Sequence, residues 1–514
     1  MRSQRLISVR VRHLGRGGML AMSLLGLVAG AGGGCESSGK DSVRLGEIYS
    51  SAAQNIGAER NPVVVIPGIL GSNLVDRETD TIVWGAFVYG AADADFPDGA
   101  RLVALPMREG VPLSELRDGV EPDGVLETLE ANVSVFKVTA LEPYKGIIQT
   151  LAAGRYVDRD IALAAAGKRR RSQPSLGEID YAGQHFTCFQ FDYDWRRDIS
   201  ENAARLDELI RDASESAGTA RGTGGAAGEG GEPVKVDVVA HSMGGLVLMY
   251  YLRYGTQKLP EDGSLPPATW EGARLVENAI LVGTPSAGSV MAMKQLVEGV
   301  AYAIITPEYR ASLLGTMPAI YQLLPRTRHA RVVDAQTGEA VSLYEVRTWQ
   351  RYGWGLADPD QEQYVQWLLP EARDAGERRR IAMDHLRKCL ARAEQFHRAI
   401  DAPMTGVPEH LRLSISLGDS HSTPSVMEVN PRTGTLRIRE RSPGDGTVTR
   451  ASALMDERTG TGGFAARLRT PIAWSDVQFI PADHVALTTH PTFVDWMLFQ
   501  LLEKPRANTP RGLN

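Results

Sequence analysis

The sequence predicts an α/β fold, in which a mostly parallel sheet carries helices on both faces and helical caps or lids are inserted between its strands. Short β-branched apolar runs, typical of buried strands, alternate along the chain with helical patterns. Two long interruptions separate some of these elements, at about residues 76–143 and 286–408. The chain has 514 residues, of which 43% are hydrophobic, so it can bury a large core.

Five apolar runs are predicted as core strands: residues 62–66, 185–193, 236–240, 279–283 and 411–417. A hairpin is expected after them, with strands at 426–429 and 436–439. The second interruption has helical periodicity and is expected to form a cap, whereas the Gly/Ala-rich run 218–231 is expected to be a mobile surface loop. Together these elements predict one domain over residues 61–503, followed by a flexible tail at 504–514.

The N-terminus predicts export. Arginines precede an apolar stretch at residues 19–31, which is an order and a length typical of a secretory signal and too short to span a membrane. The stretch ends in small residues before Cys35 and so resembles a bacterial lipobox, although Gly32 stands where leucine is most usual. Residues 1–35 are therefore predicted to be a signal peptide with Cys35 as its lipidation site, and residues 36–60 a polar tether. We expect a cell-envelope protein anchored by lipid to a bacterial membrane, with a periplasmic or secreted product as the alternative.

Charge and cysteine content exclude some classes of function. The net charge of −6 gives no overall basic footprint, which argues against nucleic acid as the main partner. The basic run at 168–171 is either a solvated loop or a contact with an anionic membrane surface. Cys188 and Cys389 form at most one disulfide, or remain as buried thiols. The spacing of His and Cys residues suggests no zinc site, and we expect neither a metal nor a cofactor.

The strongest chemical signal is Ser242, which lies between a predicted buried strand and a Leu/Met/Tyr-rich helix at 246–252. This is the context of a nucleophile elbow, where a tight turn exposes and orients a serine hydroxyl. Small residues are needed two positions to either side, because strand and helix backbones approach each other there. Ala240 and Gly244 meet that need, although a glycine is more usual at the first position. The sequence therefore predicts an α/β-hydrolase fold with a serine nucleophile.

A serine nucleophile needs a histidine base and a carboxylate that orients it, and on this fold the chain order is Ser, acid, His. His484 lies directly before a predicted C-terminal helix at 492–502 and is the preferred base. His490 is the alternative, although its position before Pro491 is typical of a helix entry. Asp445, on a glycine-flanked turn, and Asp419, which follows a predicted strand, are two candidates for the acid that the residues alone do not separate.

The negative charge that develops on an attacked carbonyl oxygen needs backbone N–H donors. One is expected from the residue after the nucleophile, Met243, and the other from the loop after the first strand, at Ile69. No metal is required if this oxyanion hole supplies the charge stabilisation.

These residues together resemble the lecithin:cholesterol acyltransferase family, which includes lysosomal phospholipase A2-like and phospholipid:diacylglycerol acyltransferase-like enzymes. The matching pieces follow the family's order, at residues 62–74, 193–196, 240–245, 283–288, 317–325 and 444–448, and at His484 with its helix. The resemblance implies a triad of Ser242, Asp445 and His484, which favours Asp445 over Asp419. It also implies oxyanion donors at Ile69 and Met243. One departure is that no cysteine pair lies between Leu74 and Cys188, where animal members close a lid loop by a disulfide.

The expected activity is that of a lipid acyl-ester hydrolase, phospholipase A-like, or a lipid O-acyltransferase, working through an acyl-enzyme. The expected partners are a phospholipid or another acyl ester, an alcohol acceptor and a membrane surface. A neutral-glyceride lipase or a carboxylesterase is the alternative within the same chemistry. A non-catalytic lipid-binding envelope protein is the alternative outside it, but that reading predicts a decayed triad position, and all three residues are present.

Overall fold

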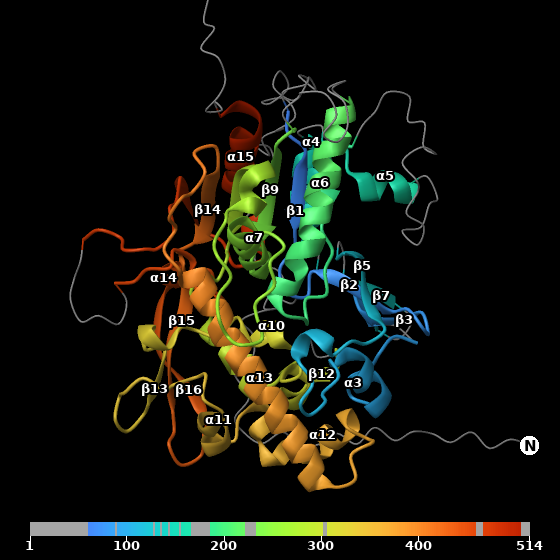
Figure 1. Ribbon diagram of the computed structural model, residues 1–514, viewed down its shortest axis with the longest axis vertical. Coiled ribbons are helices and arrows are strands. Elements are labelled where there is room, and N and C mark those ends of the chain that lie inside the picture. Colours follow the sequence, from blue (N-terminus) through green and yellow to red (C-terminus); the bar gives the residue numbers. More distant parts are fainter. Residues whose placement is uncertain are drawn as a thin grey trace, which may run out of the picture.

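A six-stranded sheet forms the centre of the protein (Figure 1). The computed structural model describes residues 60–87, 90–126, 129–133, 136–141, 144–153, 156–165, 186–220, 233–301, 306–458 and 466–504. The sheet has the order β17-β14-β10-β9-β1-β8, and its strand pairs are all parallel. Its strands are β1 (Val63–Ile66), β8 (Cys188–Gln190), β9 (Val236–His241), β10 (Val276–Val282), β14 (Arg412–Gly418) and β17 (Asp476–Ile480). The predicted α/β-hydrolase fold is confirmed.

Helices cover both faces of this sheet: α4 (Lys145–Ala153), α6 (Asn202–Ala220), α7 (Met243–Tyr254) and α15 (Pro491–Leu498) (Figure 1). Side chains alternate between the two faces along each strand. In β1, Val64 and Ile66 pack in the same core cluster as residues of α6 and α7, whereas Val63 and Val65 pack with residues of α4 and α15. Burial on both faces explains why the strands read as continuous apolar runs.

The first insertion, expected at about residues 76–143, consists mainly of strands and begins at Ser72. One small sheet has the order β3-β2-β5 and another the order β4-β6-β7. The elements are β2 (Ser72–Asp76), β3 (Thr81–Trp84), β4 (Ala86–Phe87), α3 (Pro97–Val103), β5 (Val120–Val125), β6 (Leu129–Val133) and β7 (Phe136–Leu141). Strands this short carry little periodic signal, and among the described residues of this insertion the α-helical part of the expected cap is α3.

The second insertion, expected at about residues 286–408, is mostly helical, as predicted. Its elements are α8 (Val290–Glu298), β11 (Val300–Ala301), β12 (Glu308–Tyr309), α9 (Ala311–Leu314), α10 (Pro318–Tyr321), β13 (Val332–Asp334), α11 (Val346–Tyr352), α12 (Glu362–Leu368) and α13 (Ala375–Asp401). The long helix α13 runs across this part of the molecule beside α10 and α12 (Figure 1). We call this insertion the helical cap.

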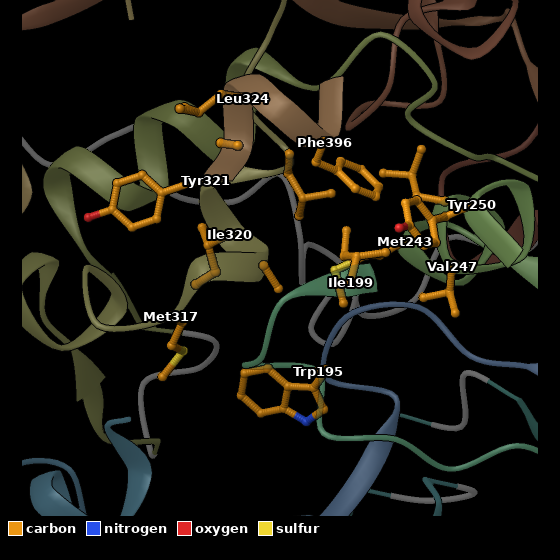
Figure 2. Close-up of a cluster of buried hydrophobic side chains, with 14 of the residues drawn as sticks. Trp195, Ile199, Met243, Val247, Tyr250, Met317, Ile320, Tyr321, Leu324 and Phe396 are labelled. Carbon is orange, nitrogen blue, oxygen red and sulfur yellow. The ribbon is translucent and has the colours of Figure 1, made fainter. Parts of the chain in front are cut away.

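The helical cap packs directly on α7. Met243, Val247 and Tyr250 of α7 lie in one buried cluster with Ile320 of α10 and Phe396 of α13 (Figure 2). The rings of Tyr250 and Phe396 stack with their centroids 5.9 Å apart. The first residue after Ser242 therefore lies in the same buried cluster as residues of the helical cap.

The expected hairpin is present but longer than predicted, as β15 (His421–Val429) and β16 (Leu436–Gly444). It forms a three-stranded sheet with β13, which pairs in parallel with β15. The remaining elements are α5 (Arg159–Ala165), α14 (Arg450–Ala453), the 3-10 turns Leu113–Glu115, Ile199–Glu201, Glu271–Leu275, Thr327–His329, Gly355–Ala357, Pro359–Gln361 and Ala486–Thr489, and the π-helical turn Phe499–Glu503.

Three predicted boundaries are wrong. The strand expected at 185–193 is limited to β8, because the chain leaves the sheet after Gln190. Helix α6 continues to Ala220, past the glycine at which the loop was expected to begin. The C-terminal helix begins at Pro491, and its last turn is a π-helix. The edge strand β17 was not predicted.

Several predictions fall on residues that the structure does not describe. They concern the signal peptide, Cys35 and the tether, the basic run at 168–171, most of the Gly/Ala-rich loop, and the tail apart from Lys504. Within the described part of the chain, no helix has the length and apolarity that a membrane span requires. Cys188 and Cys389 are buried free thiols, so the disulfide alternative is wrong.

Candidate active site

Ser242 lies at a sharp turn between β9 and α7, at the carboxyl edge of the sheet. Its backbone has φ 53° and ψ −125°, a positive φ that is costly for a residue with a side chain. The turn is held because the Ser242 amide donates to the Val282 carbonyl at 2.8 Å. A Cβ on Gly244 would lie 2.3 Å from the Pro67 carbonyl oxygen, so this position requires glycine. The predicted nucleophile elbow is thus present, and Ala240 is accommodated in β9.

The imidazole of His484 faces the serine. Its Nε2 lies 2.9 Å from the Ser242 Oγ, within hydrogen-bond distance, although the two residues are 242 positions apart in the chain. His484 follows β17, the edge strand, by four residues. Its own amide donates to the Asp445 carbonyl at 2.9 Å, so the backbone as well as the side chain is held.

Asp445 lies on the other side of the imidazole, after β16. Its Oδ2 is 2.7 Å from the Nδ1 of His484. Its Oδ1 accepts the backbone N–H groups of Thr447 at 2.9 Å and Val448 at 2.7 Å, and only 2% of the residue is exposed. These bonds orient the carboxylate, because each oxygen has a fixed donor. The structure thus brings together the three residues predicted as a triad.

The electrostatics of the site favour a protonated His484 more than an ordinary histidine environment does. Burial acts to lower the pKa of His484, but the Asp445 carboxylate outweighs it by charge and by hydrogen bonding, so the pKa is raised. In the neutral ring, Nδ1–H donates to Asp445, which leaves the lone pair of Nε2 to accept the Ser242 hydroxyl proton. This is the tautomer that general-base chemistry needs.

The two alternative residues lie in other surroundings. His490 caps α15, where its Nδ1 accepts the Thr492 amide at 3.2 Å. Asp419 is part-exposed, and its carboxylate lies 3.7 Å from the guanidinium of Arg450. His490 and Asp419 are thus engaged with other groups, so the geometry favours His484 and Asp445.

The loop after β1 lies against the nucleophile. The Gly71 amide donates to the Gly68 carbonyl at 3.1 Å, which closes a tight turn with Ile69 and Leu70 at its centre. A Cβ on Gly68 would lie 2.8 Å from the Ser242 Cβ, so only glycine permits this approach. We call residues 68–71 the oxyanion turn. Ile69 directly follows the glycine that approaches Ser242, which is consistent with its predicted role as an oxyanion donor.

Met243 is placed similarly. It is the first residue of α7, so its amide has no acceptor within the helix. The positive end of the helix dipole also lies there, where it favours negative charge. Both sequence-predicted oxyanion donors are thus next to the serine.

Sequence reasoning missed the aromatic residues that hold the oxyanion turn. Trp84 Nε1 donates to the Leu70 carbonyl at 2.8 Å, and Leu70 has a positive φ of 65°. The hydroxyl of Tyr193 donates to the Pro67 carbonyl at 2.9 Å, and Trp195 Nε1 to the Ser72 carbonyl at 3.2 Å. The Tyr-Asp-Trp-Arg sequence was the available signal, but it does not name the carbonyls that its side chains would reach.

The arginine of that sequence joins the core to the first insertion. Arg196 is fully buried and forms a two-armed ion pair with Asp194, at 2.9 and 2.8 Å. Its remaining nitrogen donates to the carbonyls of Leu102 and Val103 at the end of α3. Such a charge pair is stable in the interior only because its donors are satisfied. Its position fixes α3 relative to the loop that carries Trp195.

Comparison with protein families gives one match. The model of the lecithin:cholesterol acyltransferase family matches residues 175–352. The match covers about a third of the chain and agrees with the resemblance that the motifs indicate. The matched segment contains Ser242 and Met243, whereas Asp445 and His484 lie beyond it. The match supports an enzyme of this family's kind, which acts on lipid acyl esters as a hydrolase or an acyltransferase. No curated protein matches the chain in sequence.

Solved structures are similar at low identity. The Tle4–Tli4 complex contains a chain with 16% identity and a TM-score of 0.47, over 86% of this chain and 99% of that one. EstA from Clostridium botulinum has 11% identity and a TM-score of 0.30, over 88% and 89%. Phospholipase PlaB from Legionella pneumophila has 13% identity and a TM-score of 0.28, over 71% and 57%. These likenesses are too distant to carry an argument about activity.

Proposed function

We propose that the protein is a serine-dependent lipid acyl hydrolase or acyltransferase, phospholipase A-like, that works through an acyl-enzyme. The observation that carries this proposal is the continuous hydrogen-bonded series Asp445–His484–Ser242, with separations of 2.7 and 2.9 Å. One carboxylate–imidazole contact and one imidazole–hydroxyl contact make up this series. Together with the start of a helix and a tight glycine turn beside the serine, they supply the parts that acyl transfer needs.

In the first half-reaction, His484 takes the proton of Ser242 as its Oγ attacks the ester carbonyl. The Asp445 carboxylate stabilises the imidazolium that forms. The amides of Ile69 and Met243 bind the oxyanion, and the loss of one such donor typically costs about 3 kcal/mol. His484 then protonates the departing alcohol, which leaves the acyl group on Ser242.

In the second half-reaction, His484 activates the acyl acceptor. Water as acceptor releases a fatty acid, whereas a lipid alcohol as acceptor gives a new ester. The helical cap bears on this choice, because exclusion of water from the acyl-enzyme favours transfer. Ser242 and His484 are each only 8% exposed, which supports a site where water entry is restricted.

A lipid substrate is favoured by the family match and by the apolar surroundings of the nucleophile. Apolar residues of the helical cap, among them Ile320 and Phe396, lie in the same buried cluster as Met243 (Figure 2). We further propose that the protein acts at a membrane surface, exported and anchored through Cys35. A tethered enzyme is already located at the membrane that contains its lipid substrate.

The decisive experiment incubates the purified mature chain with labelled phospholipid, with and without a sterol or diglyceride acceptor. Free fatty acid alone means a hydrolase, and acylated acceptor means a transferase. Ser242→Ala should abolish both products. Turnover that persists in Ser242→Ala contradicts the proposed site.

A second pair of variants tests the base. His484→Ala should lose activity by several orders of magnitude, because it removes the proton acceptor. His490→Ala should retain activity and lose only part of a helix cap, which is worth about 1 kcal/mol. Activity lost only in His490→Ala would reverse this assignment.

A further inference from the structure

Two buried side chains behind the site, Tyr144 and His241, take no part in the mechanism above. His241 directly precedes Ser242, and Tyr144 directly precedes α4. They are 3% and 4% exposed. The Tyr144 hydroxyl lies 2.7 Å from the Gly68 amide nitrogen and 3.2 Å from His241 Nδ1, and His241 Nε2 lies 3.1 Å from the His484 carbonyl oxygen. A series of hydrogen-bond contacts thus joins the oxyanion turn to the backbone of His484, the proposed base.

The proton positions in this series of hydrogen bonds follow from which groups can donate and which can accept. The Gly68 amide can only donate, so the Tyr144 oxygen accepts from it. The Tyr144 proton is then donated to Nδ1 of His241, which must carry a lone pair. The remaining proton of His241 is on Nε2, and it donates to the His484 carbonyl, which can only accept. One tautomer of His241 satisfies every member.

Both side chains stay neutral through the ordinary pH range. Burial, and next the neighbouring His484, lower the pKa of His241 to about 3. Burial raises the pKa of Tyr144 above its usual range. The rings of His241 and His484 have their centroids 5.0 Å apart, so a charge on His241 would oppose the imidazolium that turnover forms on His484. The hydrogen bonds of Tyr144 and His241 therefore stay the same while His484 gains and loses its proton.

Tyr144 also contacts both ends of the oxyanion turn. A Cβ built on Gly68 would lie 3.2 Å from the Tyr144 hydroxyl, and a Cβ built on Gly71 would lie 2.7 Å from the Tyr144 ring. The Gly68 amide is occupied by this hydroxyl, so it is not free to bind an oxyanion, and the next amide in the turn is that of Ile69.

We propose that Tyr144 and His241 are positioning residues that join the oxyanion turn to the backbone of His484 and hold the Ile69 amide in register with Ser242. This inference rests on the proposed function of the same site. Oxyanion stabilisation depends on donors that are already oriented when the charge develops. Loss of the Tyr144 hydroxyl leaves the Gly68 amide without its acceptor. The turn can then rotate, so that the Gly68 amide and not the Ile69 amide faces the substrate.

The test uses reaction of Ser242 with a fluorophosphonate, which forms a phosphonyl–serine bond and expels fluoride without needing a lipid substrate. Tyr144→Phe keeps the ring and removes the hydroxyl. We expect its second-order labelling rate to fall about tenfold or more, as for a buried hydrogen bond that loses one partner. With a soluble p-nitrophenyl ester, kcat should fall by a similar factor while KM changes less than about twofold, because the affected donor acts on the transition state.

Tyr254→Phe is the matched control. It removes another buried tyrosine hydroxyl, which donates to the Ala399 carbonyl at 3.0 Å from the far end of α7. It should lower the melting temperature about as much as Tyr144→Phe and leave the labelling rate within twofold of wild type. Equal losses of labelling in both variants would show a general effect of stability and overturn the inference.

A double-mutant cycle tests whether the two residues act together. His241→Gln keeps an amide donor that can reach the His484 carbonyl, but it has no acceptor at the position of Nδ1, to which Tyr144 donates. If the two residues act as one unit, the loss of labelling rate in the double variant, relative to wild type, should be clearly smaller than the product of the two single losses. Independent effects that multiply would overturn the inference, as would a Tyr144→Phe protein that labels at the wild-type rate. Failure of the wild type to label at Ser242 would instead overturn the proposed function.

Discussion

Gly418 at the end of β14 touches Asp445: a Cβ built on Gly418 would lie 2.6 Å from the Asp445 Cβ. Real Cβ atoms essentially never come so close, so an alanine at this position must displace the loop that carries the carboxylate. The glycine that ends a core strand thereby makes room for the residue that orients the imidazole.

Gly418→Ala should therefore lower kcat without unfolding the protein. A shift of the order of 1 Å in a catalytic group can cost about 100-fold in rate, so we expect a loss between about 10-fold and 100-fold. Steady-state kinetics together with a melting curve measure it. Gly376→Ala, near the start of α13 and against only the Asp374 carboxylate at 3.1 Å, is the control and should keep wild-type kinetics. A wild-type kcat in Gly418→Ala would show that Asp445 keeps its position without a glycine at position 418.

Asp445→Asn should change both the rate and its pH dependence. The rate should fall by about 10⁴-fold, because an amide no longer holds the required tautomer. The Asp445 carboxylate raises the pKa of His484, and the proposed mechanism uses neutral His484 as the base. Removing the charge therefore lowers that pKa, and the rising limb of kcat/KM should move to lower pH. Asp419→Asn should leave the profile unchanged, and a profile that moves only in this second variant would exchange the roles of the two aspartates.

His385→Gln should make the protein less sensitive to acid. Burial lowers the pKa of His385 to about 4, so between about pH 6.5 and 4 the unfolded chain binds a proton that the folded protein does not. Stability from this residue is present above pH 6.5 and is lost as the pH falls, by about 1.4 kcal/mol per pH unit. Glutamine can still donate to the Thr316 carbonyl, which His385 Nε2 contacts at 3.0 Å.

Urea unfolding of both proteins from pH 7.5 to 4.5 measures this difference. The free energy of unfolding should fall less steeply in His385→Gln. The exposed His421, replaced by glutamine, is the control and should follow the wild-type curve. Parallel curves for His385→Gln and wild type would show that the buried ring is not held neutral.

Cys35→Ser should release the protein from the membrane. If Cys35 is acylated, the wild type sediments with membranes and its N-terminal peptide carries the mass of the acyl groups. The variant lacks the thiol, so both features should disappear while the enzymatic activity per molecule on a soluble ester is unchanged. A wild type found only in the soluble fraction, with no modified peptide, would favour the periplasmic or secreted alternative.

The elbow and five of the sheet's strands could be predicted from the sequence, because their apolar runs and flanking residues are local signals. Ser242 stands between a buried strand and a helix, and the order of acid and base follows from the fold. His484 was preferred by its position before the last helix. The structure also places it after β17, a strand that the sequence did not reveal because Val477 and Phe479 point to a part-exposed edge.

The acid and the supports of the oxyanion turn could not be derived in this way. Asp419 and Asp445 both follow strands, and only the path of the hairpin between them determines which carboxylate meets His484. Tyr144 and Trp84 lie in the first insertion or beside it, where short strands and loops hide periodicity. Their bonds to Gly68 and Leu70 depend on tertiary contacts across many residues, for which a single sequence carries no signal.

Met243 belongs to two structures at once: its amide begins α7 beside Ser242, and its side chain lies in the core that the helical cap forms on that helix. Under the proposed function, lipid selectivity and reactivity are therefore coupled through this one residue. A cap transplanted from a relative would repack the side chain and tilt the amide with it, so directed evolution of new lipid preferences should repeatedly select compensating changes at position 243.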